Sequence, residues 1–264
     1  DYLSGVSLGR VTYETFPLTA ENDFLPDLDA IPEETARRAK FIYINYPNNP
    51  TGAVATKAFY EKLVAWAKTY EVGVVSDLAY GALGYQGYEN PSFLSTPGAK
   101  DVGIEFYTFS KTFNMAGWRL AFAAGNGQMI EALNLIQDHL FVGIFPALQE
   151  AGIAALLDSK SEEAVAQLNA TYDSRRDAFV QAAAKIGWQA FPSRGSFYAW
   201  MPVPEGYTSE SFADFLLEKA HVAVAPGKGF GPAGDAYVRI GLLVEPERLV
   251  EAVNRIANLH LFNN

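Results

Sequence analysis

Short apolar runs separated by helical stretches constrain the fold of this chain more than any other feature. The runs lie at residues 41–46 (FIYINY), 72–76 (VGVVS), 104–109 (IEFYTF) and 120–124 (LAFAA). Strands that are apolar throughout are typical of sheets covered on both faces, and helices between them favour parallel pairing. The pattern therefore predicts an α/β fold, in which a mainly parallel sheet lies between two layers of helices.

Apolar residues at helical spacing predict the elements between and after these runs. Residues 56–70, 128–157 and 161–186 are expected to be helical, and residues 6–18 are expected to form a strand. The third of these helices is long and carries charges on one side, so it can bridge two domains.

After Gly187 the sequence changes in character. The segments WQAF, SFYAWMPV and AYVRIGL predict strands, and residues 209–219 and 245–259 predict helices. We therefore divide the chain into a large domain over residues 1–174 and a small α+β domain over residues 175–264.

Composition excludes several classes of site. The formal net charge is -10, which argues against nucleic acid or an anionic membrane as a partner. The chain has no cysteine, so disulfides and thiolate ligands are excluded, and no apolar run reaches the ~18 residues of a membrane span. His139, His221 and His260 lie far apart in the sequence, so we expect structural roles for them and no metal site.

Lys111 lies in the most informative string of the chain, TFSKTFNMAGWR over residues 108–119. A lysine after a strand is usually a solvated side chain, but hydroxyls and an arginine surround this one. A lysine in a cationic, partly desolvated site has a lowered pKa and can form a Schiff base with an aldehyde. Thr108, Ser110 and Arg119 have the donors and the charge that a phosphate requires.

Two further strings follow predicted strands. YPNNPTG over residues 46–52 contains Asn49, and SDLAY over residues 76–80 contains Asp77 and Tyr80. The first can be a simple turn, and Asp77 can be a helix cap. Because ligands of parallel sheets collect at the carboxyl ends of the strands, Asp77 can equally be a carboxylate that awaits a cation.

Together, the three strings resemble the fold-type I enzymes that use pyridoxal 5'-phosphate (PLP), specifically the class I and II aminotransferases. The resemblance implies that Lys111 holds PLP and that Asp77 pairs with its pyridinium nitrogen. It also implies that Asn49 and Tyr80 reach the phenolic oxygen, and that Thr108, Ser110 and Arg119 bind the phosphate.

Arg239, in the string AYVRIG, matches the arginine with which this family binds the α-carboxylate of the substrate. On residue type alone it can also be a surface arginine of an edge strand. The resemblance implies that Asn49 contributes to the same substrate site. GKGFG over residues 227–231 lacks the order of a phosphate-binding loop, so we interpret it as a turn near the mouth of the substrate site.

The resemblance covers essentially the whole chain and is closest to the methionine-salvage branch, which acts on 4-methylsulfanyl-2-oxobutanoate. The expected function is a cytoplasmic, homodimeric transaminase for an amino acid and a 2-oxo acid. Transaminases of the LL-diaminopimelate or aspartate type, a β-lyase on the same fold, and an aminotransferase-like sensing domain of a regulator remain alternatives.

The chain opens Asp1-Tyr2-Leu3 without a methionine. In the family, a glycine-rich phosphate-binding segment and an aromatic residue that stacks on the cofactor precede the point that corresponds to this start. We therefore expect an N-terminal part to be missing, and we expect the 264-residue chain alone to bind PLP weakly and not to sustain normal catalysis.

Overall fold

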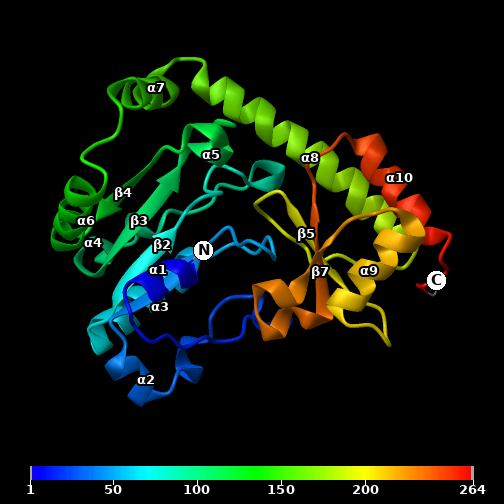
Figure 1. Cartoon of the computed structure of the whole chain (residues 1–264), viewed down its shortest axis with the longest axis horizontal. Coiled ribbons are helices and arrows are strands. Elements are labelled where there is room, and N and C mark those ends of the chain that lie inside the picture. The colour runs from blue at the N-terminus through cyan, green and yellow to red at the C-terminus, as the bar shows by residue number, and fades with distance from the viewer. Residues whose placement is uncertain (1, 263–264) are drawn as a thin grey trace.

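A computed structural model describes residues 2–262 and contains two sheets (Figure 1). The first sheet has the order β1 (Phe41–Asn45), β2 (Gly73–Asp77), β3 (Gly103–Thr108) and β4 (Ala121–Gly125). β1, β2 and β3 pair in parallel, and β4 pairs antiparallel to β3. The predicted strands and the mainly parallel pairing are thus confirmed.

Helices cover both faces of this sheet. On one face, α3 (Lys57–Tyr70) packs Leu63 and other apolar side chains against Ile42 and Val74. On the other face, α6 (Gly127–Leu140) comes so close that a β-carbon at Gly73 would lie 2.6 Å from Met129 Cε. This contact explains the glycine at the start of β2. The α/β/α layering that the apolar runs predict is present.

The second sheet belongs to the C-terminal part of the chain. It has the order β5 (Tyr198–Pro202), β7 (Tyr237–Gly241) and β6 (Ala225–Pro226), with both pairs antiparallel. A separate apolar core joins this sheet to three helices. The helices are α8 (Ser161–Lys185), α9 (Ser209–Ala220) and α10 (Pro246–Ala257).

Helix α8 runs past both parts of the molecule (Figure 1). Its Tyr172 packs with Tyr80 and Phe197, whereas its Phe179 lies in the core of the small sheet. The domain boundary expected after residue 174 falls between these two contacts, inside a continuous helix, and it stays a prediction.

Two expected elements are wrong because local backbone groups interrupt them. Residues 6–18 do not form a strand: α1 (Tyr2–Leu8) ends near Arg10, which has a φ of 52°, and residues 11–19 pair with no described strand. The expected helix 128–157 is two helices, because Pro146 lacks an N–H and begins α7 (Pro146–Leu157) anew.

WQAF, residues 188–191, is also not a strand. The Trp188 indole N–H donates to the Pro202 carbonyl at 2.8 Å, and the Phe191 N–H donates to the Trp200 carbonyl at 3.1 Å. The segment therefore lies alongside β5 without forming a ladder, and it buries Trp188 fully and Phe191 partly. The three remaining helices are α2 (Glu33–Arg38), α4 (Ala99–Val102) and α5 (Phe109–Thr112).

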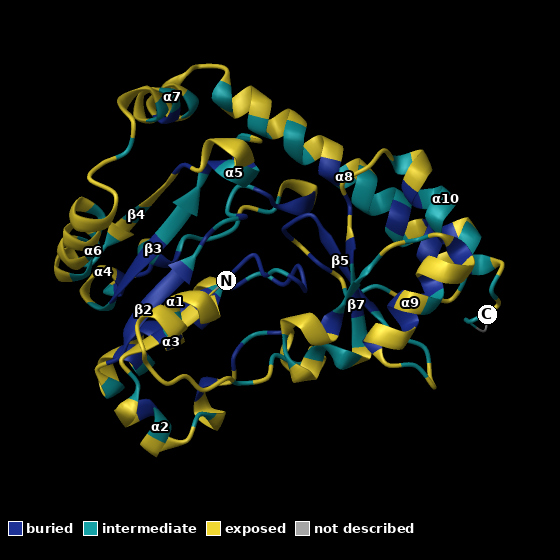
Figure 2. Ribbon diagram, in the orientation of Figure 1, coloured by how far each residue is buried: buried dark blue, intermediate teal, exposed yellow. Residues whose placement is uncertain are grey.

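Burial is greatest in β2, in β5 and in the loops between the two sheets, whereas β4 is largely exposed (Figure 2). α7 and the first half of α8 are largely exposed. Within residues 2–262, no helix combines the length and the apolar character needed to cross a membrane.

Candidate active site

The predicted site residues follow the carboxyl ends of the three parallel strands. Asn49 lies in the turn after β1, Asp77 is the last residue of β2, and Lys111 lies in α5 directly after β3. Adjacent parallel strands end at the same edge of a sheet, so these residues gather at that edge. The small sheet contributes Arg239 from β7.

A pocket of about 540 Å³ lies at this edge. Asn49, Asp77 and Tyr80 contribute to its wall, and Asp77 is the one charged side chain among the described lining residues. The remaining wall is largely apolar or aromatic and includes Phe16 and Phe230. The pocket thus combines a carboxylate and polar side chains with an apolar wall.

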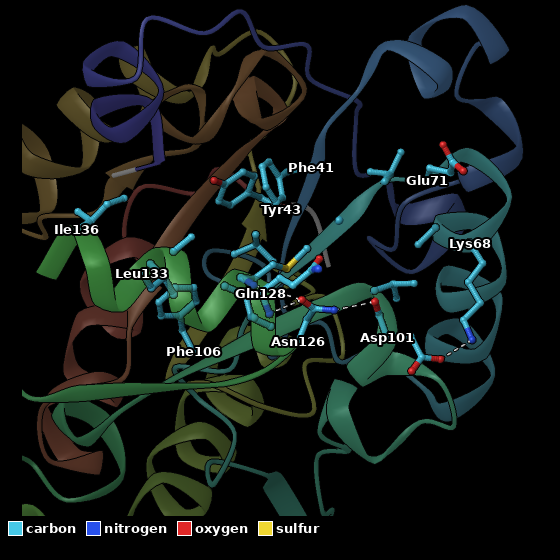
Figure 3. Close-up of a pocket in the computed structure, with 18 residues that line it drawn as sticks. Phe41, Tyr43, Lys68, Glu71, Asp101, Phe106, Asn126, Gln128, Leu133 and Ile136 are labelled. Atoms are coloured by element: carbon cyan, nitrogen blue, oxygen red, sulfur yellow. Dashed lines mark hydrogen bonds and ion pairs between the residues drawn. The ribbon is translucent and has the colours of Figure 1, made fainter.

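A larger hollow, of about 880 Å³, lies between α6 and the face of the large sheet (Figure 3). Apolar side chains such as Phe41, Phe106 and Leu133 line it, and the Lys68–Asp101 ion pair lies at its rim. None of the predicted site residues borders it. Size alone would point to this hollow, but Asn49, Asp77 and Tyr80 border the smaller pocket, while Lys111 and Arg239 are not among its described lining residues.

The turn after β1 is fastened by a network of side-chain hydrogen bonds. Asn48 Oδ1 accepts from Thr51 Oγ1 at 2.7 Å, and both residues are buried. Asn45 Oδ1 accepts from the Asn49 backbone N–H at 2.9 Å, while Asn45 Nδ2 donates to the Asp77 carbonyl at 3.0 Å. The turn interpretation of this string is correct, and the turn also fixes Asn49 beside the end of β2.

Asn49 contacts Arg239 across the gap between the two sheets. Arg239 Nη1 donates to Asn49 Oδ1 at 2.7 Å. The carboxamide oxygen of Asn49 accepts this hydrogen bond. The Nδ2 group can therefore only donate, and it donates to none of the described residues. A ligand with an acceptor oxygen can therefore bind there.

Asp77 uses its two oxygens differently. Oδ1 accepts from the Ala79 N–H at 3.1 Å, which is a capping contact, although a turn and not a helix follows. Oδ2 accepts from the Tyr2 hydroxyl at 2.6 Å. Burial, and then the negative charge of Asp77, raises the pKa of Tyr2, so this hydroxyl keeps its proton and donates. The Asp77 carboxylate thus caps the local turn with one oxygen and borders the pocket, where its other oxygen contacts Tyr2.

The Lys111 amine lies among aromatic rings. Its Nζ is 5.4 Å from the centroid of the Phe197 ring and 5.9 Å from that of Tyr80. Tyr80 is buried, and its burial, followed by a hydrogen bond with Tyr198, raises its pKa. The tyrosine is therefore a protonated donor at neutral pH. The structure brings Lys111 and Tyr80 together, as the resemblance implies.

The expected phosphate-binding residues are only partly brought together. Thr108 Oγ1 lies 3.0 Å from Ser110 Oγ and also accepts from the Ser110 N–H at 3.2 Å. Arg119 is exposed, and its Nη1 donates to the Ala116 carbonyl at 2.8 Å. The two hydroxyls thus form a pair, while the guanidinium points to its own turn.

Sequence reasoning missed four aromatic residues that border this site. Phe197 and Tyr198 lie in a run interpreted only as an apolar strand, and Phe230 lies in the turn near the substrate mouth. Tyr2 lies in a segment expected to lead into a strand, although it reaches Asp77. Their contacts join segments far apart in the chain, so no local pattern could have revealed them.

The side chains present suit PLP. A lysine amine, a carboxylate and a free carboxamide N–H match its aldehyde, ring nitrogen and phenolic oxygen, and the paired hydroxyls match its phosphate. The donor set that the structure brings to one sheet edge is the set that this cofactor needs.

The profile of the class I and II aminotransferases matches residues 1–256. The L-glutamine–4-(methylsulfanyl)-2-oxobutanoate aminotransferase of Bacillus subtilis (strain 168) is 56% identical over 262 residues, which are 99% of this chain and 65% of that relative. The LL-diaminopimelate aminotransferase of Moorella thermoacetica is 50% identical over 240 residues, 91% of this chain and 61% of that relative.

Solved structures agree with these matches. The apo form of BacF from Bacillus subtilis superposes with a TM-score of 0.94 at 45% identity. The match covers 100% of this chain and 67% of that one. The chain spans less than two thirds of the length of the curated relatives named above.

Proposed function

Because this chain belongs to the class I and II aminotransferase family, we propose that the protein is a PLP-dependent aminotransferase that moves an amino group between an amino acid and a 2-oxo acid. One observation carries the proposal. Asn49 from the large sheet and Arg239 from the small sheet meet at 2.7 Å, beside the pocket that Asp77 and Tyr80 border. Groups for the cofactor and for a substrate carboxylate are therefore adjacent.

When bound, PLP supplies an electron sink for the carbanion formed at the substrate Cα. In our proposal, the chain supplies the remaining functions. Lys111 holds the cofactor and moves a proton to and from Cα, as a general base and acid. Asp77 keeps the ring nitrogen protonated, and its Tyr2 contact fixes the direction of the carboxylate.

The other polar residues bind and orient. Asn49, through Nδ2, and the protonated Tyr80 donate to the phenolic oxygen. Arg239 binds the α-carboxylate with its planar fork, which directs the Cα–H bond over the ring. Thr108, Ser110 and Arg119 bind the phosphate.

For the substrate, we propose methionine and 4-methylsulfanyl-2-oxobutanoate. The name of the B. subtilis relative, which gives L-glutamine and 4-(methylsulfanyl)-2-oxobutanoate, supports the oxo acid of this pair, and so does the pocket, whose described wall has no charged side chain besides Asp77. LL-diaminopimelate carries a second ammonium and a second carboxylate, which would lack partners in such a wall. The apolar Phe16, Leu18 and Phe230 suit an unbranched thioether.

We further propose that the protein is cytoplasmic and acts as a homodimer, as the family resemblance implies, with domains over residues 1–174 and 175–264. Sedimentation at micromolar concentration should give a dimer, and a monomer alone would contradict this part of the proposal.

A half-reaction screen tests the function. The PLP-loaded protein is mixed with single amino acids, and absorbance reports conversion of PLP to its amine form. We expect conversion with methionine and glutamine, and little with LL-diaminopimelate. Release of ammonia and a 2-oxo acid without the amine form would indicate a β-lyase. Ligand binding without either product would indicate a sensing domain.

A further inference from the structure

Arg239 is a partly buried cation that pairs with no carboxylate of residues 2–262. Its guanidinium carbon lies 4.2 Å from the centroid of the Tyr198 ring and 4.7 Å from that of Phe230. Its one described side-chain hydrogen bond goes to Asn49. A guanidinium has five N–H donors, so most of them are left for a ligand.

Support by aromatic rings has a different effect from support by a carboxylate. An acidic partner would occupy the guanidinium fork and cancel its charge, and would then compete with the carboxylate of a substrate. The face of a ring attracts the cation without accepting its N–H bonds in that fork. Rings can therefore fix the direction of Arg239 and leave its charge and its donors available.

Tyr198 and Phe230 are not equivalent supports. Tyr198 is 9% exposed and lies on β5, which pairs directly with β7, the strand of Arg239. Phe230 is 40% exposed and lies at the end of a short turn. The Tyr198 ring also meets the Tyr80 ring edge to face, with centroids 6.0 Å apart. Tyr198 alone of the two contacts a residue proposed to bind the cofactor.

We infer that Tyr198 is a positioning residue. Its ring holds the carboxylate-binding guanidinium of Arg239 in a fixed orientation relative to Tyr80, and therefore relative to the cofactor. This inference rests on the proposed role of Arg239. It assigns to the ring the task of orienting Arg239, whereas the Tyr198 hydroxyl shares a hydrogen bond with Tyr80.

Two substitutions separate the ring from the hydroxyl. Tyr198→Phe keeps the ring, whereas Tyr198→Leu removes it, and Tyr198→Met is a second ring-free variant in case leucine impairs folding. The first measurement is calorimetric binding of pentanoate, a simple monocarboxylate, to each protein. We expect Tyr198→Phe to bind within about twofold of the wild type and the ring-free variants about tenfold more weakly, which corresponds to about 1.4 kcal/mol.

The second measurement compares methionine with 3-(methylsulfanyl)propylamine, which has the same chain without the carboxylate. The ring-free variants should raise the KM for methionine about tenfold with a smaller change in kcat, and should leave the reaction with the amine as in the wild type. Equal losses for both compounds would mean a merely structural role and would overturn the inference.

Two other outcomes are also decisive. If Tyr198→Phe is as impaired as Tyr198→Leu, the hydroxyl acts and the ring does not, and the inference is wrong. If the wild type binds pentanoate and converts methionine, and Tyr198→Leu does so equally well, only this inference fails. If the wild type does neither, the proposed function itself fails.

Discussion

The polar side chains of the turn after β1 are buried and hydrogen-bonded to one another, whereas the proposed phosphate-binding side chains after β3 are half-buried or exposed. Asn48 and Thr51 are buried and bonded to each other at 2.7 Å. In the second segment, Thr108 and Ser110 are half-buried, and Arg119 is exposed and bonded only to a carbonyl of its own turn. Both segments carry proposed cofactor groups, but those of the second are less buried, although Phe109 and Thr112 of that segment are themselves buried.

This difference predicts how substitutions divide between stability and activity. A buried group that loses its partner lowers the free energy of unfolding, because its desolvation is no longer compensated. A half-buried or exposed group that serves a ligand can change with little effect on folding. The first segment should therefore be sensitive in stability, and the second mainly in ligand binding and turnover.

Lys111→Ala should give the largest effect on activity. The amine forms no hydrogen bond or ion pair with residues 2–262, and its nearest described partners are the rings of Phe197 and Tyr80 at more than 5 Å. We expect turnover to be abolished while the melting temperature changes by about 2 °C or less. Lys100→Ala, at an exposed lysine of α4, is the matched control and should keep full activity.

Peptide mapping makes the Lys111 prediction sharper. Borohydride reduction of the PLP-loaded wild type should fix the cofactor on the peptide that contains Lys111. A label on any other lysine, or turnover by Lys111→Ala, would contradict the proposed role of Lys111. The segment after β3 would then no longer be the one that mainly affects turnover.

Asp77→Asn should have the next largest effect. The new carboxamide can still accept from the Ala79 N–H, so the local turn is kept, but its charge and its acceptance from Tyr2 at Oδ2 are lost. We expect kcat to fall about 100-fold, or about 2.7 kcal/mol in the barrier. Urea unfolding should show a smaller change. Retained kcat with lost stability would mean that Asp77 is only a capping residue.

Asn48→Ala and Ser110→Ala test the comparison directly. Asn48→Ala removes the acceptor of Thr51 Oγ1 and of the Thr51 N–H, inside the buried turn. The free energy of unfolding should fall by about 2 kcal/mol. Ser110→Ala removes a half-buried hydroxyl, so unfolding should change by about 0.5 kcal/mol or less, while the Kd for PLP should rise. Equal losses of stability would break the comparison.

Much of the large sheet could be predicted from the sequence, because each continuous apolar run forms a strand, although only β2 is buried along most of its length and Phe41, Tyr43 and Phe122 are exposed. The same reasoning was wrong for residues 6–18, where an alternating pattern has no described strand beside it to pair with. It was also wrong for WQAF, in which Trp188 is buried and Phe191 partly buried although the backbone makes no ladder. Apolar patterns report burial, and pairing depends on neighbours that the pattern does not contain.

The site divides in the same way. Asn49, Asp77 and Lys111 follow strands that end at one edge, so local strings and strand order were enough to predict their gathering. The contacts of Tyr198 with Arg239 and of Tyr2 with Asp77 join residues 41 and 75 positions apart. These depend on the pairing of β5 with β7 in the small sheet and on the packing of α1 on the large sheet, which no single string encodes.

A substitution of Glu105 should give the smallest effect. It tests whether the stability of the large sheet depends on pH. This carboxylate is 6% exposed, lies on β3 beside Ser76 and accepts from Ser76 Oγ at 3.0 Å and from the Phe93 N–H at 2.8 Å. Burial raises its pKa above the ordinary value of 4.5, although its hydrogen bonds, including one from Ser92, oppose the shift. The folded protein therefore binds the proton more tightly than the unfolded chain does.

The sign of the resulting pH dependence follows from linkage. Stability from a group with a raised pKa is fully present below the unfolded value of 4.5, and it is lost as the pH rises through the folded value. Glu105→Gln removes this titration. The wild-type free energy of unfolding minus that of the variant should thus decline as the pH rises above 4.5, measured by urea unfolding at a series of pH values. Glu61→Gln, at an exposed position of α3, should show no such decline. If this difference in the free energy of unfolding instead grows with pH, the hydrogen bonds to Glu105 outweigh its desolvation. The ionised carboxylate would then stabilise β3.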